Sequence, residues 1–91
     1  MTQILVEHDP SPMKLEVMAV DSWPVVDKPV STFSRDYEQT QTCYIAEGHA
    51  LVSAEGGEAV EVGEGDLVTL MPGLSCTWDI QSAMKIHYLC G

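Results

Sequence analysis

The residues of this chain best suited to chemistry are its cysteines and histidines. The three cysteines, Cys43, Cys76 and Cys90, are odd in number and contain no C-x-x-C pair. This pattern argues against a disulfide framework and against a thiolate zinc knuckle. Each cysteine is expected to be a small buried side chain in a reducing compartment, so the sequence predicts a cytoplasmic protein.

Two of these residues are candidates for catalysis. The imidazole of His87 could act as a general acid or base near neutral pH. Cys76 could act as a nucleophile only if a neighbouring cation or imidazole lowered its pKa. Cations are scarce, with four Lys and Arg against fourteen Asp and Glu. Arg35 is either an anion anchor or an ordinary surface charge, and no catalytic residue is assigned.

The elements that must position these residues are short strands, because five Pro and seven Gly interrupt the chain and the segments between them are β-branched and alternating. Gly48 is expected to form a bend or bulge, and Glu55-Gly56-Gly57 a tight hairpin turn. Such a series of strands and turns predicts an all-β antiparallel sandwich or small barrel. The predicted strands are residues 13–20, 42–47, 49–54, 58–62 and 66–71, with two more near 74–80 and 83–90.

Length and charge exclude several classes of protein. A chain of 91 residues with 45% hydrophobic and 20% charged residues predicts one globular domain over 1–91, with residues 1–12 as a candidate loose segment. The net charge of −10 argues against nucleic acids and anionic membrane surfaces as partners. No apolar run is long enough for a membrane span, and the first residues do not resemble a secretory signal.

The run 66–71 is apolar on both faces of its predicted strand. Leu67 and Met71 lie on one face, and Val68 and Leu70 on the other. One face would fill the barrel, so the other needs a cover from an N-terminal strand or a partner subunit. This pattern predicts a homodimer.

Several segments together resemble a known family. They are TCYIAEG (42–48), GEGDLVTL (63–70), GLSCTW (73–78) and His87-Tyr88. In order and spacing they resemble the small single-domain cupins, in the branch related to the cupin domain of ureidoglycine aminohydrolase. The resemblance extends from about Trp23 to Tyr88. It implies a single antiparallel jelly-roll β-barrel with a ligand or a metal in its interior.

The family's metal-ligand positions are poorly filled in this chain. Aligning the first cupin motif on Gly48 places Gln41 at the family's Glu ligand and puts the two His positions around residues 35–37. Aligning the second motif on Gly65 and Gly73 places Cys76 at the third His. An amide and one thiol lack most of the affinity of three imidazoles and a carboxylate, so no metal site and no cofactor are expected. A divalent metal held by Cys76 with Cys43 or His87 is the weaker alternative.

The same positions predict the lining of a pocket. If Gln41 points inward, period-two alternation turns Cys43 inward as well, and Trp78 shares a face with Cys76. Alternation turns His87 away from the more apolar face of its strand, although either face could be the cavity. Aromatic walls with few polar groups suit a small, partly apolar ligand, while a filled core is the alternative. The candidate ligand-binding residues are Tyr37, Gln41, Cys43, Cys76, Trp78 and His87.

Three functions follow from this pattern. The leading interpretation is a stand-alone cupin that binds a small molecule without a complete metal site. The second is an enzyme acting on a small nitrogenous or carbonyl metabolite, in which Tyr37, Gln41, Cys76 and His87 would orient or protonate the substrate. The third is a degenerate barrel that serves dimerisation or partner docking.

Overall fold

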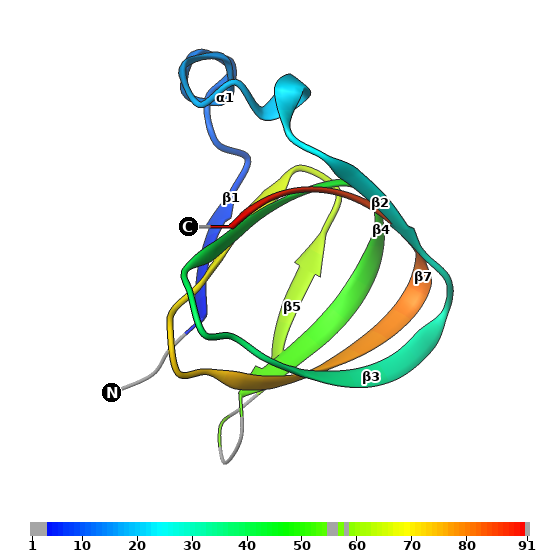
Figure 1. The fold of residues 1–91 in the computed structure, drawn as a ribbon. Helices are drawn as coiled ribbons and strands as arrows, with labels where there is room; N and C mark the ends of the chain where they lie inside the picture. Colours follow the sequence, from blue (N-terminus) through cyan, green and yellow to red (C-terminus); the bar gives the residue numbers. More distant parts are fainter. Residues whose placement is uncertain (1–3, 55–56, 58, 91) are drawn as a thin grey trace.

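The computed structural model describes residues 4–54, 57 and 59–90, and it is an antiparallel β-barrel (Figure 1). Most of the predicted hairpin turn at residues 55–57, and the first residue of the predicted strand 58–62, lie outside this range. The elements are β1 (Ile4–His8), α1 (Pro12–Val17), the short 3-10 helix η1 (Val20–Ser22), β2 (Val25–Lys28), β3 (Ser31–Asp36), β4 (Gln41–Ala54), β5 (Ala59–Gly63), β6 (Asp66–Leu70) and β7 (Ser75–Cys90).

Two long strands, β4 and β7, run through both halves of the barrel and pair with each other along most of their length. The first part of β4 also pairs with β6, and its second part pairs with β5. In the same way β7 pairs with β3 in its first part and with β2 in its second. Each long strand therefore pairs with three others, and all seven described strands form one sheet that curves into the jelly roll that the sequence predicted. The two strands predicted near 74–80 and 83–90 are one continuous strand.

Gly48 lies where the pairing partner of β4 changes from β6 to β5. The pairing of β4 with β7 shifts register between Ile45 and Ala50, as a β-bulge does. Gly48 has φ +96°, a conformation that L side chains rarely adopt. The bulge predicted at this glycine is therefore confirmed.

The alternating residues of β4 and β7 form the core. Inward positions of β4, such as Cys43 and Val52, are almost fully buried, and so are Trp78 and Ile80 on β7. These side chains belong to one cluster with Val68 and other residues of β6. The inward facing predicted for Gln41, Cys43, Cys76 and Trp78 matches this burial.

The prediction of a strand at residues 13–20 is wrong, because most of this segment belongs to α1 and η1. Ser11 caps the helix by accepting a hydrogen bond from the Lys14 backbone N–H at 3.2 Å, and Pro12 occupies the first turn. Ser followed by Pro is a helix-start signal that outweighs the alternating pattern behind it. Ala19 then reverses the chain with φ 55°.

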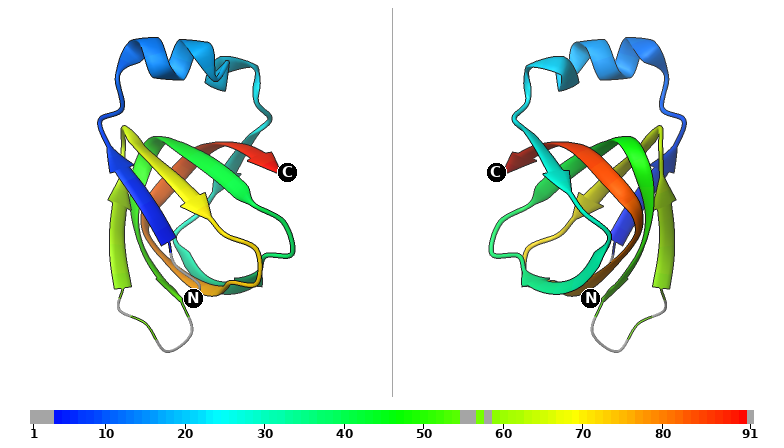
Figure 2. Two further views of the ribbon diagram at one scale, coloured as in Figure 1. Left: turned by 90° about the vertical axis from the view of Figure 1, so that its left-hand side faces the viewer. Right: turned by 90° about the vertical axis from the view of Figure 1, so that its right-hand side faces the viewer.

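This helical segment covers the outer face of the barrel wall (Figures 1 and 2). Val20 and Trp23 pack against Leu67 of β6 in a second buried cluster, with Tyr44 of β4 beside it. The cover that Leu67 requires therefore comes from the N-terminal part of the same chain, although as helix rather than strand. The homodimer stays a prediction.

Residues 4–8 lie within the segment that the sequence marked as a candidate loose region. They form β1, which pairs antiparallel with β6. His8 Nδ1 lies 2.8 Å from Oδ1 of the buried Asp66, and the other carboxylate oxygen of Asp66 accepts a hydrogen bond from the Gly63 backbone N–H at 2.8 Å. One carboxylate thus joins the start of β6 to the end of β5 and to the end of β1.

Asp66→Ala is expected to lower the free energy of unfolding by about 2 kcal/mol, since it removes the acceptor for a partly buried backbone N–H. Urea denaturation followed by circular dichroism measures this loss. Asp79→Ala is the matched control, because Asp79 accepts only an exposed hydrogen bond from Thr32 among the bonds described and should cost under about 1 kcal/mol. Equal losses in the two variants would contradict the structural role given to Asp66.

Within the described residues, no helix is long and apolar enough to cross a membrane.

Candidate functional site

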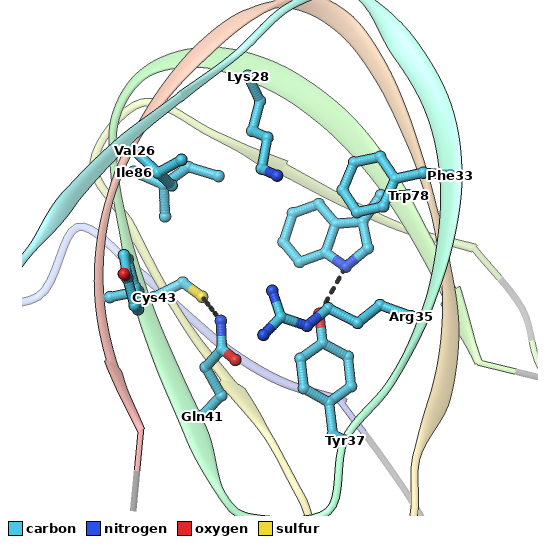
Figure 3. Close-up of a pocket in the computed structure, with 10 residues that line it drawn as sticks. Val26, Lys28, Phe33, Arg35, Tyr37, Gln41, Cys43, Trp78 and Ile86 are labelled. Atoms are coloured by element: carbon cyan, nitrogen blue, oxygen red, sulfur yellow. Dashed lines mark hydrogen bonds between the residues drawn. The ribbon is translucent and has the colours of Figure 1, made fainter.

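A cavity of about 140 Å³ lies inside the barrel, and β2, β3, β4 and β7 all contribute to its walls (Figure 3). Cavities near 150 Å³ accommodate a molecule the size of benzene. The lining is mainly apolar and aromatic, with a few polar groups among these side chains. The lining residues are Val26, Lys28, Phe33, Arg35, Tyr37, Gln41, Cys43, Trp78, Ile86 and Tyr88.

Strand β3 supplies one wall through alternate residues. Phe33 pairs in register with Trp78 of β7, and their rings are stacked with centroids 6.3 Å apart and an interplanar angle of 3°. Arg35, two residues further, lines the same cavity. The intervening Ser34 is exposed and contacts Thr77 on the outer side. The strand period therefore turns every second side chain of β3 towards the cavity.

Tyr37 is fixed at the end of this wall. Its backbone N–H donates to the Leu74 carbonyl at 2.8 Å, and its own carbonyl accepts from the Gly73 N–H at 2.7 Å. Its hydroxyl accepts a hydrogen bond from Trp78 Nε1 at 2.9 Å. Burial raises the pKa of Tyr37 to about 12, against the lowering effects of the Trp78 hydrogen bond and the Arg35 charge. Tyr37 is therefore a neutral phenol at physiological pH.

The opposite wall comes from the first residues of β4. Gln41 and Cys43 are two residues apart, so both face inward, and both are buried. The Gln41 amide Nε2 donates to Cys43 Sγ at 3.5 Å. Figure 3 shows this pair across the cavity from the indole of Trp78. Four of the predicted ligand-binding residues, Tyr37, Gln41, Cys43 and Trp78, thus line one cavity.

Two cationic side chains also line the cavity. Lys28 Nζ lies 5.1 Å from the centroid of the Phe33 ring, and the Arg35 guanidinium carbon lies 5.5 Å from the centroid of the Tyr37 ring. Both side chains point towards the same central space in Figure 3. The sequence alone leaves the role of Arg35 open and does not identify Lys28 or Phe33. The available signal was alternation, since Lys28 follows Val26 by two residues on β2.

Cys76 lies close to this site without lining it. It is paired in register with Arg35 and is buried in the core. Burial raises the pKa of the Cys76 thiol above its usual value. The thiol is therefore neutral at physiological pH, a state that does not favour a nucleophilic role.

The structure does not bring His87 to the cavity. Its Nδ1 donates to the Val20 carbonyl at 3.1 Å, and its ring meets that of Tyr44 edge-on, with centroids 6.2 Å apart. Both partners belong to or adjoin the outer cluster beneath the helical segment. The inward-facing residues of this part of β7 are Met84 and Ile86, so the strand period turns His87 outward, which is one of the two orientations that the sequence left open. A ligand in this cavity would therefore not contact His87, which is not one of the lining residues.

The cupin metal-ligand positions hold the wrong donors for a divalent metal. They carry Arg35, Tyr37, Gln41 and Cys76, which are a cation, a neutral phenol, an amide and a protonated thiol. Borderline metals prefer imidazole and carboxylate ligands. Among the described residues there is no group of three or more His, Cys, Asp or Glu side chains that could hold a metal ion. The donor set therefore does not fit the group that the resemblance implies.

A closed antiparallel jelly roll with a small interior pocket at its motif positions defines a cupin barrel. The chain belongs to the EutQ-like cupin family, whose model matches residues 15–88. A search of curated proteins finds no match.

Solved structures show the same fold. A DUF861 family protein from Thermotoga maritima is 37% identical, with a TM-score of 0.94 over 98% of this chain and 100% of that one. A DUF861 family protein from Pseudomonas syringae is 25% identical over 74% of this chain and 29% of its own, with a TM-score of 0.66. The Clostridium difficile EutQ protein is 14% identical over 98% and 68%, with a TM-score of 0.67.

Proposed function

We propose that this chain is a cytoplasmic cupin that binds a small molecule in its barrel interior without a bound metal. The observation that carries the proposal is the cavity between the Phe33–Trp78 stack and the Gln41–Cys43 pair. A barrel whose only purpose was docking would gain stability from a filled interior, because empty apolar space costs packing energy. Retained space of about 140 Å³ therefore supports binding over a purely structural role.

The same residues favour binding over catalysis. Tyr37 and Cys76 carry raised pKa values and hold their protons near neutral pH. His87 contacts the outer cluster instead of the cavity. The enzyme alternative thus lacks the titratable groups assigned to it. The relation to the ureidoglycine aminohydrolase branch rests on the sequence resemblance and stays a prediction.

Filling the cavity is expected to abolish binding. In Val26→Trp, an indole placed on the half-buried inward face of β2 would occupy the ligand's space. Screening a library of neutral and anionic fragments of roughly benzene size by ¹H–¹⁵N NMR should give compounds that shift the Trp78 indole N–H of the wild type. These shifts should persist with a chelator present and disappear in Val26→Trp.

Val25→Trp is the matched control, because Val25 is the exposed neighbour of Val26 and does not line the cavity. It should bind the same fragments as the wild type. If Val26→Trp does not fold, Val26→Phe replaces it. A library with no member that shifts the Trp78 signal, or fragments that bind equally to both variants, would overturn the proposal. So would binding that a chelator removes.

A further inference from the structure

The cavity concentrates positive charge in a chain that has very little. The sequence contains four Lys and Arg in total, and two of them, Lys28 and Arg35, line this one pocket. The pocket lining includes no Asp or Glu. Lys14, by contrast, forms an ion pair with Glu7. Among the described residues, neither Lys28 nor Arg35 takes part in an ion pair.

Each of the two cationic side chains lies over an aromatic ring of the pocket wall. Lys28 lies over Phe33 and Arg35 over Tyr37, at distances typical of cation–π contacts, which hold a charge without cancelling it. The acidic residues near the two cations form no ion pair with them among the described residues, although Asp36 and Glu38 share a surface hollow with Arg35. Asp36 accepts a hydrogen bond from Ser75 at 2.7 Å and is exposed, and Asp27 is exposed opposite Lys85 on the outer side of β2.

We propose, on the basis of the proposed function, that the ligand is a small organic carboxylate with a flat apolar body. Lys28 and Arg35 would hold the carboxylate, because an ammonium and a guanidinium form charge-assisted hydrogen bonds with it. The body would lie against the Trp78 and Phe33 rings, whose stacked faces form the apolar wall. A cavity of about 140 Å³ limits that body to about one ring.

Matched ligands test this inference. Benzoate is titrated against the ¹⁵N-labelled protein beside benzamide, its neutral isostere, and inorganic phosphate, an anion without an apolar body. Benzoate should shift the Trp78 indole N–H and bind about tenfold or more tightly than the other two. Lys28→Met and Arg35→Met should each weaken benzoate about tenfold and leave benzamide within about twofold. Lys85→Met removes the same charge from an exposed outer position and should change benzoate affinity less than twofold.

The outcomes separate this inference from the proposed function. If benzamide binds in the pocket as tightly as benzoate and the cation variants change nothing, the carboxylate is wrong while the binding function stands. Equal binding of phosphate and benzoate would overturn the apolar body. If benzoate gives no pocket shifts while neutral fragments do, the carboxylate inference fails alone. If no fragment of either kind shifts Trp78, both proposals fail.

Discussion

Gly48→Ala is expected to lower the free energy of unfolding by about 4 kcal/mol or more, a large part of the stability of a domain this size. Two costs combine at this position. An alanine Cβ would press on the Ala83 carbonyl oxygen and lie 2.8 Å from Met84 Cα, so it would push β7 away from β4 at the bulge. The backbone must also keep φ +96°, and this conformation costs a non-glycine residue about 1–3 kcal/mol more.

Two other glycines separate these costs. Gly65 has φ +89° but meets only the Asp9 carboxylate at 3.1 Å, so Gly65→Ala should lose about 1–2 kcal/mol from backbone strain. The Cβ of Gly63→Ala would have neighbours at 3.6 Å and beyond, and this variant should lie within about 1 kcal/mol of the wild type. Urea denaturation of the three variants should rank the losses as Gly48, Gly65 and Gly63. A Gly48 variant as stable as the Gly65 variant would show that β7 can move away from the bulge at little cost.

The sequence predicted the part of the fold that depends on local pattern. The bend at Gly48 follows from one glycine. The inward facing of Gln41, Cys43 and Trp78 follows from the cupin-motif positions of Gln41 and Cys76 together with a period of two, and both features are present. The prediction for residues 13–20 was wrong because the alternating pattern of a short segment, which favours a strand, competes with an N-terminal cap, which favours a helix. There the cap at Ser11 decides the structure.

The site was harder to predict because its lining depends on strand pairing. Tyr37, Gln41, Cys43 and Trp78 occupy or neighbour motif positions and could be assigned from the sequence. Lys28 reaches the pocket only because β2 pairs with the second part of β7, a contact between residues far apart in the chain. For the same reason the orientation of His87 could not be predicted: its outward contact with the Val20 carbonyl requires the helical segment, for which the sequence predicted a strand.

The phenol of Tyr37 is expected to make the fold sensitive to alkali. Its pKa rises from 10.0 to about 12 on folding, because burial disfavours the phenolate. Ionisation of this group does not affect the stability of the folded state below the unfolded-state pKa of 10.0. As the pH rises from there towards about 12, the free energy of unfolding falls, because the unfolded chain releases a proton that the folded chain retains. A shift of this size corresponds to about 2–3 kcal/mol.

Comparison of the wild type with Tyr37→Phe isolates this contribution from the other groups that titrate in alkali. The variant should be less stable near neutrality by about 1–3 kcal/mol, because Trp78 Nε1 loses its buried acceptor. The gap should then close as pH rises from 10 to 12, because only the wild type must bury a phenol that the unfolded chain prefers to ionise. Urea denaturation across this pH range measures the free energy of unfolding of both proteins.

Tyr44→Phe is the control, because it removes a phenol beside the outer cluster; its free energy of unfolding should change with pH as that of the wild type does. A constant gap between wild type and Tyr37→Phe would mean that Tyr37 ionises as easily in the folded protein as in the unfolded chain, and that the pocket wall is wetter than its burial implies.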